Sequence, residues 1–204
     1  GLLGRMVCAC GPVNKQMKTA TFPSADVVHA LETAAGCSHH TLIDAIWGYT
    51  QFELDEPTRK VLTVCSRSGL YEWLRMPFGP APAPAMMQSY VHGKFGVLEN
   101  PRTKRRFCDP LMDDIKASSP SFAEHVEDII VLLKAASKSG FEFKVGKAQF
   151  NQREIILWGS LCSGAGRKPL PQKVMQLENW PEPTEQSDLV SFLAFTNYLR
   201  EFLD

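Results

Sequence analysis

The sequence predicts an α+β fold, and three observations support this prediction. Strand-like and helix-like segments follow one another in the order strand, helix, hairpin, helix, strand, without the regular βαβ alternation of a doubly wound sheet. Hydrophobic residues make up 44% of the chain and charged residues 22%, as in ordinary globular proteins. A length of 204 residues is sufficient for one large domain, or two small ones, with a hydrophobic core.

The charge balance does not decide for or against a nucleic-acid partner. Lys and Arg total 22, as do Asp and Glu, so the formal net charge is +0. The one basic cluster, at 102–106, is either a solvated loop or a phosphate contact. No apolar run approaches the ~20 residues of a membrane-spanning helix, and the first residues do not resemble a signal peptide. We therefore expect an intracellular protein without a membrane partner.

The cysteines and histidines do not predict a zinc site. The six cysteines, at 8, 10, 37, 65, 108 and 162, form no Cys-x-x-Cys pair and no Cys/His set with zinc spacing. They are typical of reduced, semi-buried thiols. His39 and His40 have no partners at ligand spacing, so we expect them on the surface.

The first elements are a strand over 1–10, broken at Gly11, and a helix that begins near 27 and ends at Gly36. An apolar strand over 41–49 then carries Asp44, an acid that is costly to bury unless it is paired or bound to a metal. A strand-terminal Asp that caps a turn is the alternative. Since the chain starts inside a strand pattern, we expect a fragment of a longer protein.

The middle of the chain predicts a small antiparallel set of strands over 51–54, 61–65 and 70–74, with Pro57 in the first turn. The proline-rich segment that follows is too rigid for a helix or a central strand. It leads into a helix near 85–91, with Pro84 suited to the first turn.

Asp113 and Asp114 are adjacent acids between short apolar pairs. On a regular strand they would point to opposite faces, but at a hairpin tip both can face one cation, which relieves their repulsion. A solvated turn explains most isolated Asp-Asp pairs.

The remaining elements begin with a helix that a capping box at Ser121 starts and Gly140 ends. We expect its apolar stripe to be core; the stripe comprises Phe122, Val126, Ile129, Ile130, Leu133 and Ala136. Strands over 141–145 and 155–161, a glycine break at 164–166 and a looser proline-containing stretch over 169–183 follow. A final helix over 189–203 ends with the chain.

Taken in order, these motifs resemble the reverse transcriptases of gypsy-type LTR retrotransposons, with the retroviral enzymes as cousins. The segment from Asp44 to Tyr49 is similar to the Leu-Asp-x-x-x-Gly-Tyr motif of that family, and Leu111 to Ile115 to its Tyr-x-Asp-Asp box. Further similar segments, in register along nearly the whole chain, are 5–14, 70–79, 83–88, 150–152, 157–159, 180–184, 191–193 and 197–202.

The resemblance implies a polymerase palm, an antiparallel sheet backed by helices, with partial fingers and the start of the thumb. The implied division is 1–19 and 52–82 for the fingers, 20–51 and 83–164 for the palm, and 165–204 for the start of the thumb or connection. It also implies an RNA-directed DNA polymerase that uses two Mg²⁺ ions, with Mn²⁺ as a substitute. The implied partners are an RNA or DNA template with its primer, dNTPs, and the thumb, RNase H and integrase of a larger polyprotein, in the cytoplasm, a virus-like particle or the nucleus.

Roles for individual residues follow from the same resemblance. The implied catalytic and metal-binding residues are Asp44, Asp113 and Asp114, and the implied dNTP-binding residues are Arg5, Ala45, Tyr49, Met112 and Lys147, with Lys144 as an alternative to Lys147. Tyr49 would exclude a ribose 2′-hydroxyl, unless it is a core residue. Leu157, Trp158 and Gly159 would form the primer grip, although Trp158 could equally be core.

The chain departs from the family pattern at several positions. Leu111 replaces the usual tyrosine of the acidic box, and Ala9 and Gly11 replace a charged pair. Asp109 and Pro110 are expected to interrupt what is a buried apolar strand in the family, because proline cannot donate to a central ladder. A more varied, flexible segment is replaced by the proline-rich residues 80–82. These departures keep an alternative open: a catalytically inactive, domesticated domain that binds nucleic acid or protein.

Overall fold

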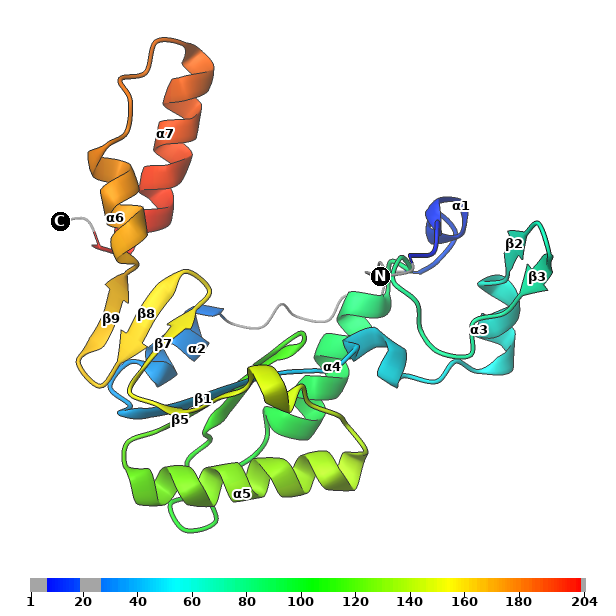
Figure 1. The fold of residues 1–204 in the computed structure, drawn as a ribbon, viewed down its shortest axis with the longest axis horizontal. Helices are drawn as coiled ribbons and strands as arrows, with labels where there is room; N and C mark the ends of the chain where they lie inside the picture. Colours follow the sequence, from blue (N-terminus) through cyan, green and yellow to red (C-terminus); the bar gives the residue numbers. More distant parts are fainter. Residues whose placement is uncertain (1–6, 19–26, 203–204) are drawn as a thin grey trace.

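The computed structural model of the chain describes residues 7–18 and 27–202. Among these residues the strands form three antiparallel sheets, with the orders β4-β5-β1-β6, β2-β3 and β7-β8-β9. Figure 1 shows the four-stranded sheet between the β2-β3 hairpin at one end and the β7-β8-β9 sheet with its two helices at the other. The predicted α+β class is confirmed.

The elements have the following bounds. The helices of the described residues are α1 (Gly11–Asn14), α2 (Val27–Ala34), α3 (Glu56–Val61), α4 (Ala83–Phe95), α5 (Phe122–Ser139), α6 (Pro171–Glu178) and α7 (Gln186–Leu199), with 3-10 turns η1 (Gly48–Gln51), η2 (Val145–Lys147) and η3 (Arg200–Phe202). The strands are β1 (His39–Asp44), β2 (Val64–Ser66), β3 (Gly69–Tyr71), β4 (Cys108–Leu111), β5 (Asp114–Ser119), β6 (Gln149–Gln152), β7 (Glu154–Leu157), β8 (Ser160–Ser163) and β9 (Gly166–Pro169).

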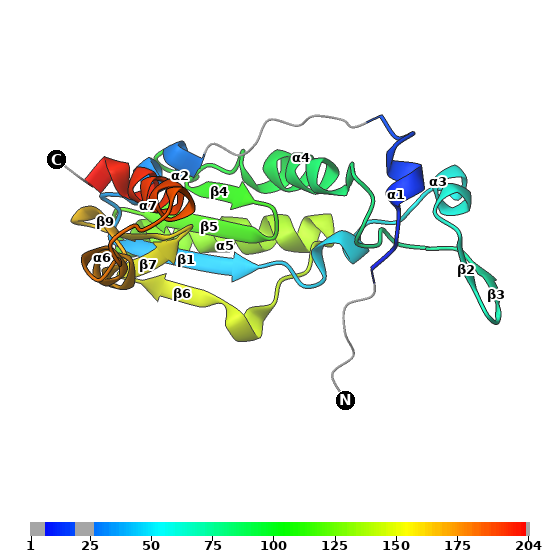
Figure 2. The same cartoon turned by 90° about the horizontal axis from the view of Figure 1, so that it is seen from above.

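The four-stranded sheet is covered on both faces, and β1 lies between β5 and β6. Ile43 and Ile115 pair across β1 and β5 and are buried against α4 and α5, whose Phe95 and Leu132 belong to the same cluster. Leu42 points to the other face, where α2 packs with the β7-β8 hairpin. Figure 2 shows the order of the four strands from above. This alternation aims the side chains of β1 at two different layers.

The strand that carries Asp109 and Pro110 is intact, which corrects the expectation from sequence. β4 lies at the edge of the sheet, where a proline is tolerated because no further strand needs its missing N–H. Asp109 forms an ion pair with Lys116, its partner in the register of β5, and Lys116 is 1% exposed. Lys116 Nζ also donates to the Ala30 carbonyl (3.0 Å) and to Thr33 Oγ1 (2.9 Å). The two charged residues therefore satisfy each other and join the hairpin to α2.

His39 and His40 are buried, so the expectation that they lie on the surface is wrong. Both begin β1, which has a neighbouring strand on each side. The Nδ1 atom of His40 lies 2.9 Å from Ser118 Oγ, and that of His39 lies 2.7 Å from Asn151 Oδ1. These partners compensate in part for the loss of water around the imidazoles, although Nε2 of His40 is buried without a hydrogen-bond partner among the described residues.

Helix α5 begins and ends where the sequence predicts, but the predicted core stripe is only partly correct. Ser121 Oγ accepts the Glu124 N–H, and Gly140 ends the helix with a φ of 69°. The inward face is instead partly polar: the buried residues of the helix are His125, Asp128, Leu132 and Ala136. Four residues of the predicted stripe are exposed: Phe122, Val126, Ile130 and Leu133. A helical apolar pattern does not reveal which of two neighbouring faces meets the sheet.

The basic cluster at 102–106 is largely neutralised by acids. Arg105 forms ion pairs with Asp128 (2.8 Å) and Glu124 (3.8 Å), and Arg102 approaches Glu127 at 3.5 Å. All three acids lie on α5. The loop is therefore part of the fold rather than a free cationic surface.

Three further segments differ from the expected strands. The expected turn between the strands 51–54 and 61–65 is the helix α3, because Asp55 caps its N-terminus and Pro57 fits its first turn, and the following strand β2 begins only at Val64. The expected strand over 155–161 is the β7-β8 hairpin, which turns at Trp158 (φ 42°) and Gly159 (φ 89°). Residues 141–145 contribute only a bridge between Phe143 and Ala45, and the looser stretch after 169 contains α6.

The expected first strand lies mostly outside the described residues; within them, Val7 forms a parallel bridge with Phe78. None of the described helices is both long and apolar enough to cross a membrane.

Candidate active site

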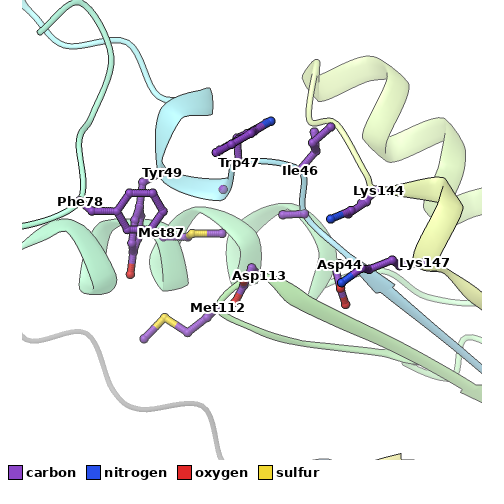
Figure 3. Close-up of a pocket in the computed structure, with 12 residues that line it drawn as sticks. Asp44, Ile46, Trp47, Tyr49, Phe78, Met87, Met112, Asp113, Lys144 and Lys147 are labelled. Carbon is purple, nitrogen blue, oxygen red and sulfur yellow. The ribbon is translucent and has the colours of Figure 1, made fainter. Parts of the chain in front are cut away.

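A cavity of about 390 Å³ opens where β1 ends, between α4, the tip of the β4-β5 hairpin and the turn η2. Figure 3 shows the side chains that line it. Six of the residues to which the resemblance assigned roles are among them: Asp44, Ala45, Tyr49, Met112, Asp113 and Lys147. Residues that are far apart in the sequence thus meet in one hollow.

The hairpin tip has a backbone conformation that depends on a buried side chain. Met112 has a φ of 55°, in the left-handed region that a methionine seldom adopts. Gln88 of α4, which is buried, accepts the Met112 N–H at 2.7 Å and donates to the Pro110 carbonyl at 3.0 Å. The Ala45 N–H donates to the Asp113 carbonyl at 2.7 Å. These three bonds hold the acidic tip against α4 and β1.

Three carboxyl groups crowd together at this point. Asp44 and Asp114 are register partners across β1 and β5. The pKa of Asp114 is raised to about 6, first by burial and then by the charge of Asp113, a side-chain hydrogen bond with Asp44 and the charge of Asp44. Carboxylates that repel one another in this way are stabilised by a cation.

The donor set suits Mg²⁺. No group of three or more His, Cys, Asp or Glu side chains within residues 7–18 and 27–202 is arranged to hold an ion. Mg²⁺ needs only one or two carboxylates, because it keeps several waters and takes the remaining oxygens from a substrate phosphate. Asp44 and Asp113, which line the same cavity, meet that requirement.

The loop after Asp44 is held in place by Gln51. Its Nε2 donates to the carbonyls of Ile46 (2.7 Å) and Glu142 (2.9 Å), and its Oε1 accepts the Glu142 N–H at 2.8 Å. The Tyr49 ring is therefore fixed at the side of the cavity, where it meets Phe78 edge to face at 5.0 Å. Burial, together with the charge of Asp113, raises the pKa of the Tyr49 hydroxyl.

Two lysines line the side of the cavity nearest Asp44. The Lys144 N–H donates to the Asp44 carbonyl at 2.8 Å, which fixes its position. In Figure 3 the Lys144 and Lys147 side chains both lie on this side, and the amine of Lys147 points toward Asp44. Both Lys144 and Lys147 line the cavity, so the structure does not favour one of them over the other.

The comparison with known families identifies the fold. Residues 6–196 match the family described as reverse transcriptase (RNA-dependent DNA polymerase). The chain belongs to the reverse transcriptase family.

Retrotransposon polyproteins are among the relatives of this reverse transcriptase domain. It is 30% identical over 182 residues to the retrovirus-related Pol polyprotein from transposon 297 of Drosophila melanogaster, covering 89% of the chain and 17% of that protein. It is 27% identical over 199 residues to the transposon Tf2-3 polyprotein of Schizosaccharomyces pombe, covering 98% of the chain and 15% of that protein. The chain thus spans about a sixth of the length of these relatives. The resemblance to retrotransposon enzymes is confirmed.

Solved structures support the fold of the reverse transcriptase domain. The foamy viral protease-reverse transcriptase dRH in complex with double-stranded DNA matches with a TM-score of 0.81 at 19% identity, over 96% of this chain and 33% of that one. The foamy viral protease-reverse transcriptase in complex with an RNA/DNA hybrid matches with a TM-score of 0.72 at 18% identity, over 92% of this chain and 25% of that one. The predicted palm architecture is confirmed.

Not all residues with predicted roles meet at the cavity of the reverse transcriptase domain. Arg5 lies outside the described residues. The turn Leu157–Gly159 belongs to the β7-β8 hairpin, where Leu157 is buried and Trp158 is half-buried against the α2 cluster. A Cβ atom on Gly159 would collide with the Tyr198 hydroxyl, so α7 lies against this turn.

Sequence reasoning missed the roles of Gln88 and Gln51 in this site. Gln51 ends the turn η1 and Gln88 lies in the helix α4, and nothing in the neighbouring residues indicates which backbone groups their side chains bind. The only available signal is that Gln88 follows the Ala83-Pro84-Ala85 motif by one helical turn, on the face that α4 buries.

Proposed function

We propose that the chain is the palm, with partial fingers and the start of the thumb, of an RNA-directed DNA polymerase. It would transfer a nucleotide from a dNTP to a primer 3′-hydroxyl. The observation that carries this proposal is the crowding of Asp44, Asp113 and Asp114 at one end of the central sheet, beside a cavity with two lysines. Crowded acids next to a cationic wall suit a substrate that arrives as a metal-bound triphosphate.

The carboxylates would hold two Mg²⁺ ions, or Mn²⁺ in their place. Asp44 and Asp113 would bridge the ions, with Asp114 and the Ala45 carbonyl as further ligands. When bound, the ions lower the pKa of the primer hydroxyl and stabilise the leaving pyrophosphate. Mg²⁺ is favoured because every donor in this set is a hard oxygen atom.

Other residues would position the substrates. Lys147, with Lys144 beside it, would bind the triphosphate, and Arg5 would add a guanidinium suited to phosphate oxygens. The Tyr49 ring would exclude a ribose 2′-hydroxyl, and Met112 would lie under the primer terminus. The turn Leu157–Gly159 would contact the primer backbone.

The implied partners belong to the same proposal. They are an RNA or DNA template with its primer, dNTPs, and the thumb, RNase H and integrase of a larger polyprotein inside the cell. The titles of two structural neighbours name bound double-stranded DNA and an RNA/DNA hybrid, which supports a duplex partner.

The test is primer extension on an RNA template with the chain, dNTPs and Mg²⁺. Asp113→Asn should lower the rate by at least roughly 10²-fold, because one bridging carboxylate is lost. Glu182→Gln, which changes an exposed acid between α6 and α7, is the matched control and should leave the rate unchanged. Equal rates for Asp113→Asn and the unmodified chain would refute the proposal.

The alternative of a catalytically inactive domain now has less support. The intact β4 strand and the paired Asp109 remove one of its arguments, which leaves Leu111 in place of a tyrosine and the departures at Ala9, Gly11 and 80–82. A catalytically inactive domain would bind a nucleic-acid duplex with an affinity that falls steeply with salt, and it would show no metal-dependent primer extension.

A further inference from the structure

Trp47 presents an unusual surface at the cavity. It lines the same hollow as Asp44 and Asp113, yet 60% of its surface is exposed. A large indole left in contact with water gains no burial free energy for the fold. An exposed aromatic ring in a polar pocket is typical of a surface that contacts a ligand.

The backbone of Trp47 is held in a strained conformation. Its φ is 50°, in the left-handed region that bulky residues rarely adopt. The Trp47 carbonyl accepts two hydrogen bonds from Thr50, from the N–H at 2.8 Å and from Oγ1 at 2.9 Å. The preceding carbonyl, that of Ile46, accepts from Gln51 at 2.7 Å. Strain that neighbouring bonds maintain in this way is concentrated at functional sites.

The next residue, Gly48, lies close against α4. A Cβ atom on Gly48 would lie 2.5 Å from Cε of Met87 on α4, so the backbone here already touches the helix. The indole therefore stands at the mouth of the cavity and not in the core. In Figure 3 it lies between the Tyr49 and Phe78 side and the Lys144 side.

These two sides have different chemistry. Tyr49 and Phe78 form an aromatic wall, whereas Lys144 and Lys147 provide positive charge. A nucleoside triphosphate, with an apolar base and sugar and an anionic tail, is complementary to both. Trp47 precedes the Gly48-Tyr49 step directly, at the junction of the two sides.

We propose that Trp47 is a nucleotide-contacting residue whose ring packs against the incoming deoxynucleoside triphosphate. This inference rests on the proposed polymerase function and adds a residue to its nucleotide pocket. The contact forms on binding and persists in the transition state, so it lowers KM and leaves kcat nearly unchanged.

The first experiment uses the indole as its own reporter. The chain has four tryptophans, and dTTP with Mg²⁺, added without primer, should quench part of their fluorescence. Trp47→Phe should abolish this quench. Trp180→Phe is the control and should retain it, because Trp180 packs against Phe192 and Phe195 of α7, away from the cavity.

The second experiment measures affinity with a variant that the backbone tolerates. Asn adopts the left-handed region more readily than other residues, so Trp47→Asn should keep the thermal midpoint of the chain or raise it. Its dTTP binding by calorimetry should weaken roughly three- to tenfold, the usual contribution of an aromatic contact. In primer extension, KM for dTTP should rise by the same factor.

The outcomes separate the two proposals. If the unmodified chain binds dTTP and Trp47→Asn binds it equally well, the Trp47 contact is refuted while the polymerase proposal stands. A quench that persists in Trp47→Phe also refutes the contact. If the unmodified chain extends a primer with the same KM for dTTP as Trp47→Asn, the contact is refuted and the polymerase proposal stands. If the unmodified chain neither binds dTTP with Mg²⁺ nor extends a primer, both proposals fail.

Discussion

The two ends of strand β1 carry polar clusters of opposite character. At the end that includes His39 and His40, the buried carboxylate of Asp128 accepts hydrogen bonds from Arg105, Asn100 and Ser119. At the other end, Asp44 faces Asp114 and lies near Asp113, and burial together with these like charges raises the pKa of Asp114. One sheet therefore carries a buried acid that the protein itself neutralises and a group of acids that repel one another.

This difference separates stability from function. A satisfied buried network strengthens the native state only while all its members are present. Crowded carboxylates weaken the native state and are retained where they bind a ligand. Substitutions at the His39 end of β1 should therefore change the free energy of unfolding, and substitutions at the Asp44 end should change the rate of primer extension.

The largest effect is expected for Asp44→Asn. The rate of primer extension should fall at least roughly 10³-fold, about 4 kcal/mol of transition-state stabilisation, because a bridging ligand is removed. The Mg²⁺-free thermal midpoint should stay the same or rise, since a like charge beside Asp114 is lost. Both are measured on one preparation, by extension assay and by thermal unfolding. A drop in the thermal midpoint would mean that the acidic end also stabilises the fold, and the two ends of β1 would then not differ in this respect.

The next largest effect is expected at the opposite end. Asp128 is fully buried and accepts three hydrogen bonds, so Asp128→Asn should lower the free energy of unfolding by about 3 kcal/mol. Urea unfolding measures this change. Glu127→Gln, one position earlier, removes the charge of a half-buried carboxylate that pairs with Arg102, while its amide oxygen can still accept from Asn100, so it should cost less than about 1 kcal/mol. If Asp128→Asn and Glu127→Gln were equally stable, the hydrogen bonds of Asp128 would not stabilise the fold as proposed.

The histidines of the same network should make the fold sensitive to acid. Burial lowers the pKa values of both His40 and His125 from 6.5 to about 4, and the nearby positive charges of Lys116 and Arg105 act in the same direction. The unfolded chain therefore binds more protons below pH 6.5. Stability is complete above that pH and falls as the pH drops toward 4, by about 1 to 2 kcal/mol per histidine between about pH 7 and pH 5.

Urea unfolding across this pH range, with His40→Gln, tests the acid sensitivity. The variant should lose less stability on acidification, because one of the two proton-binding sites is absent from the unfolded chain. His92→Gln replaces an exposed histidine and serves as the control. If the free energy of unfolding changed equally with pH in the unmodified chain, His40→Gln and His92→Gln, the buried imidazoles would not govern the acid sensitivity.

The smallest effect is expected for Gln88, the neutral residue that shapes the acidic end. Gln88→Met leaves the Met112 N–H and the Pro110 carbonyl without their partner. The extension rate should fall roughly tenfold, about 1.4 kcal/mol, as the hairpin tip loses its fixed position. Met86→Ala, on an exposed part of the same helix, should have no effect on the rate. Full activity of Gln88→Met would show that the tip keeps its geometry without the glutamine.

Local signals in the sequence predicted much of the fold. The cap at Ser121, the left-handed Gly140 and the position of Pro84 are properties of a few neighbouring residues, and α5 and α4 follow them. The position of Asp113 at a hairpin tip was also predicted, because apolar pairs flank it on both sides. At residues 56–61 a turn was expected, and the cap at Asp55 with Pro57 in the first turn starts the helix α3 instead.

By itself, then, the sequence determined the α+β class, the order of most elements and the acids at the end of β1, since these depend on local patterns and on motifs kept in register. Only the tertiary structure decided which polar residues are buried and what satisfies them. From the sequence, Asp109 was expected to break a strand, but Lys116 lies opposite it and forms an ion pair with it. His39 was expected on the surface, but β1 has a neighbouring strand on each side. Burial and charge pairing depend on elements that are distant in the chain, and so does Gln88, whose two partners lie 22 and 24 residues away.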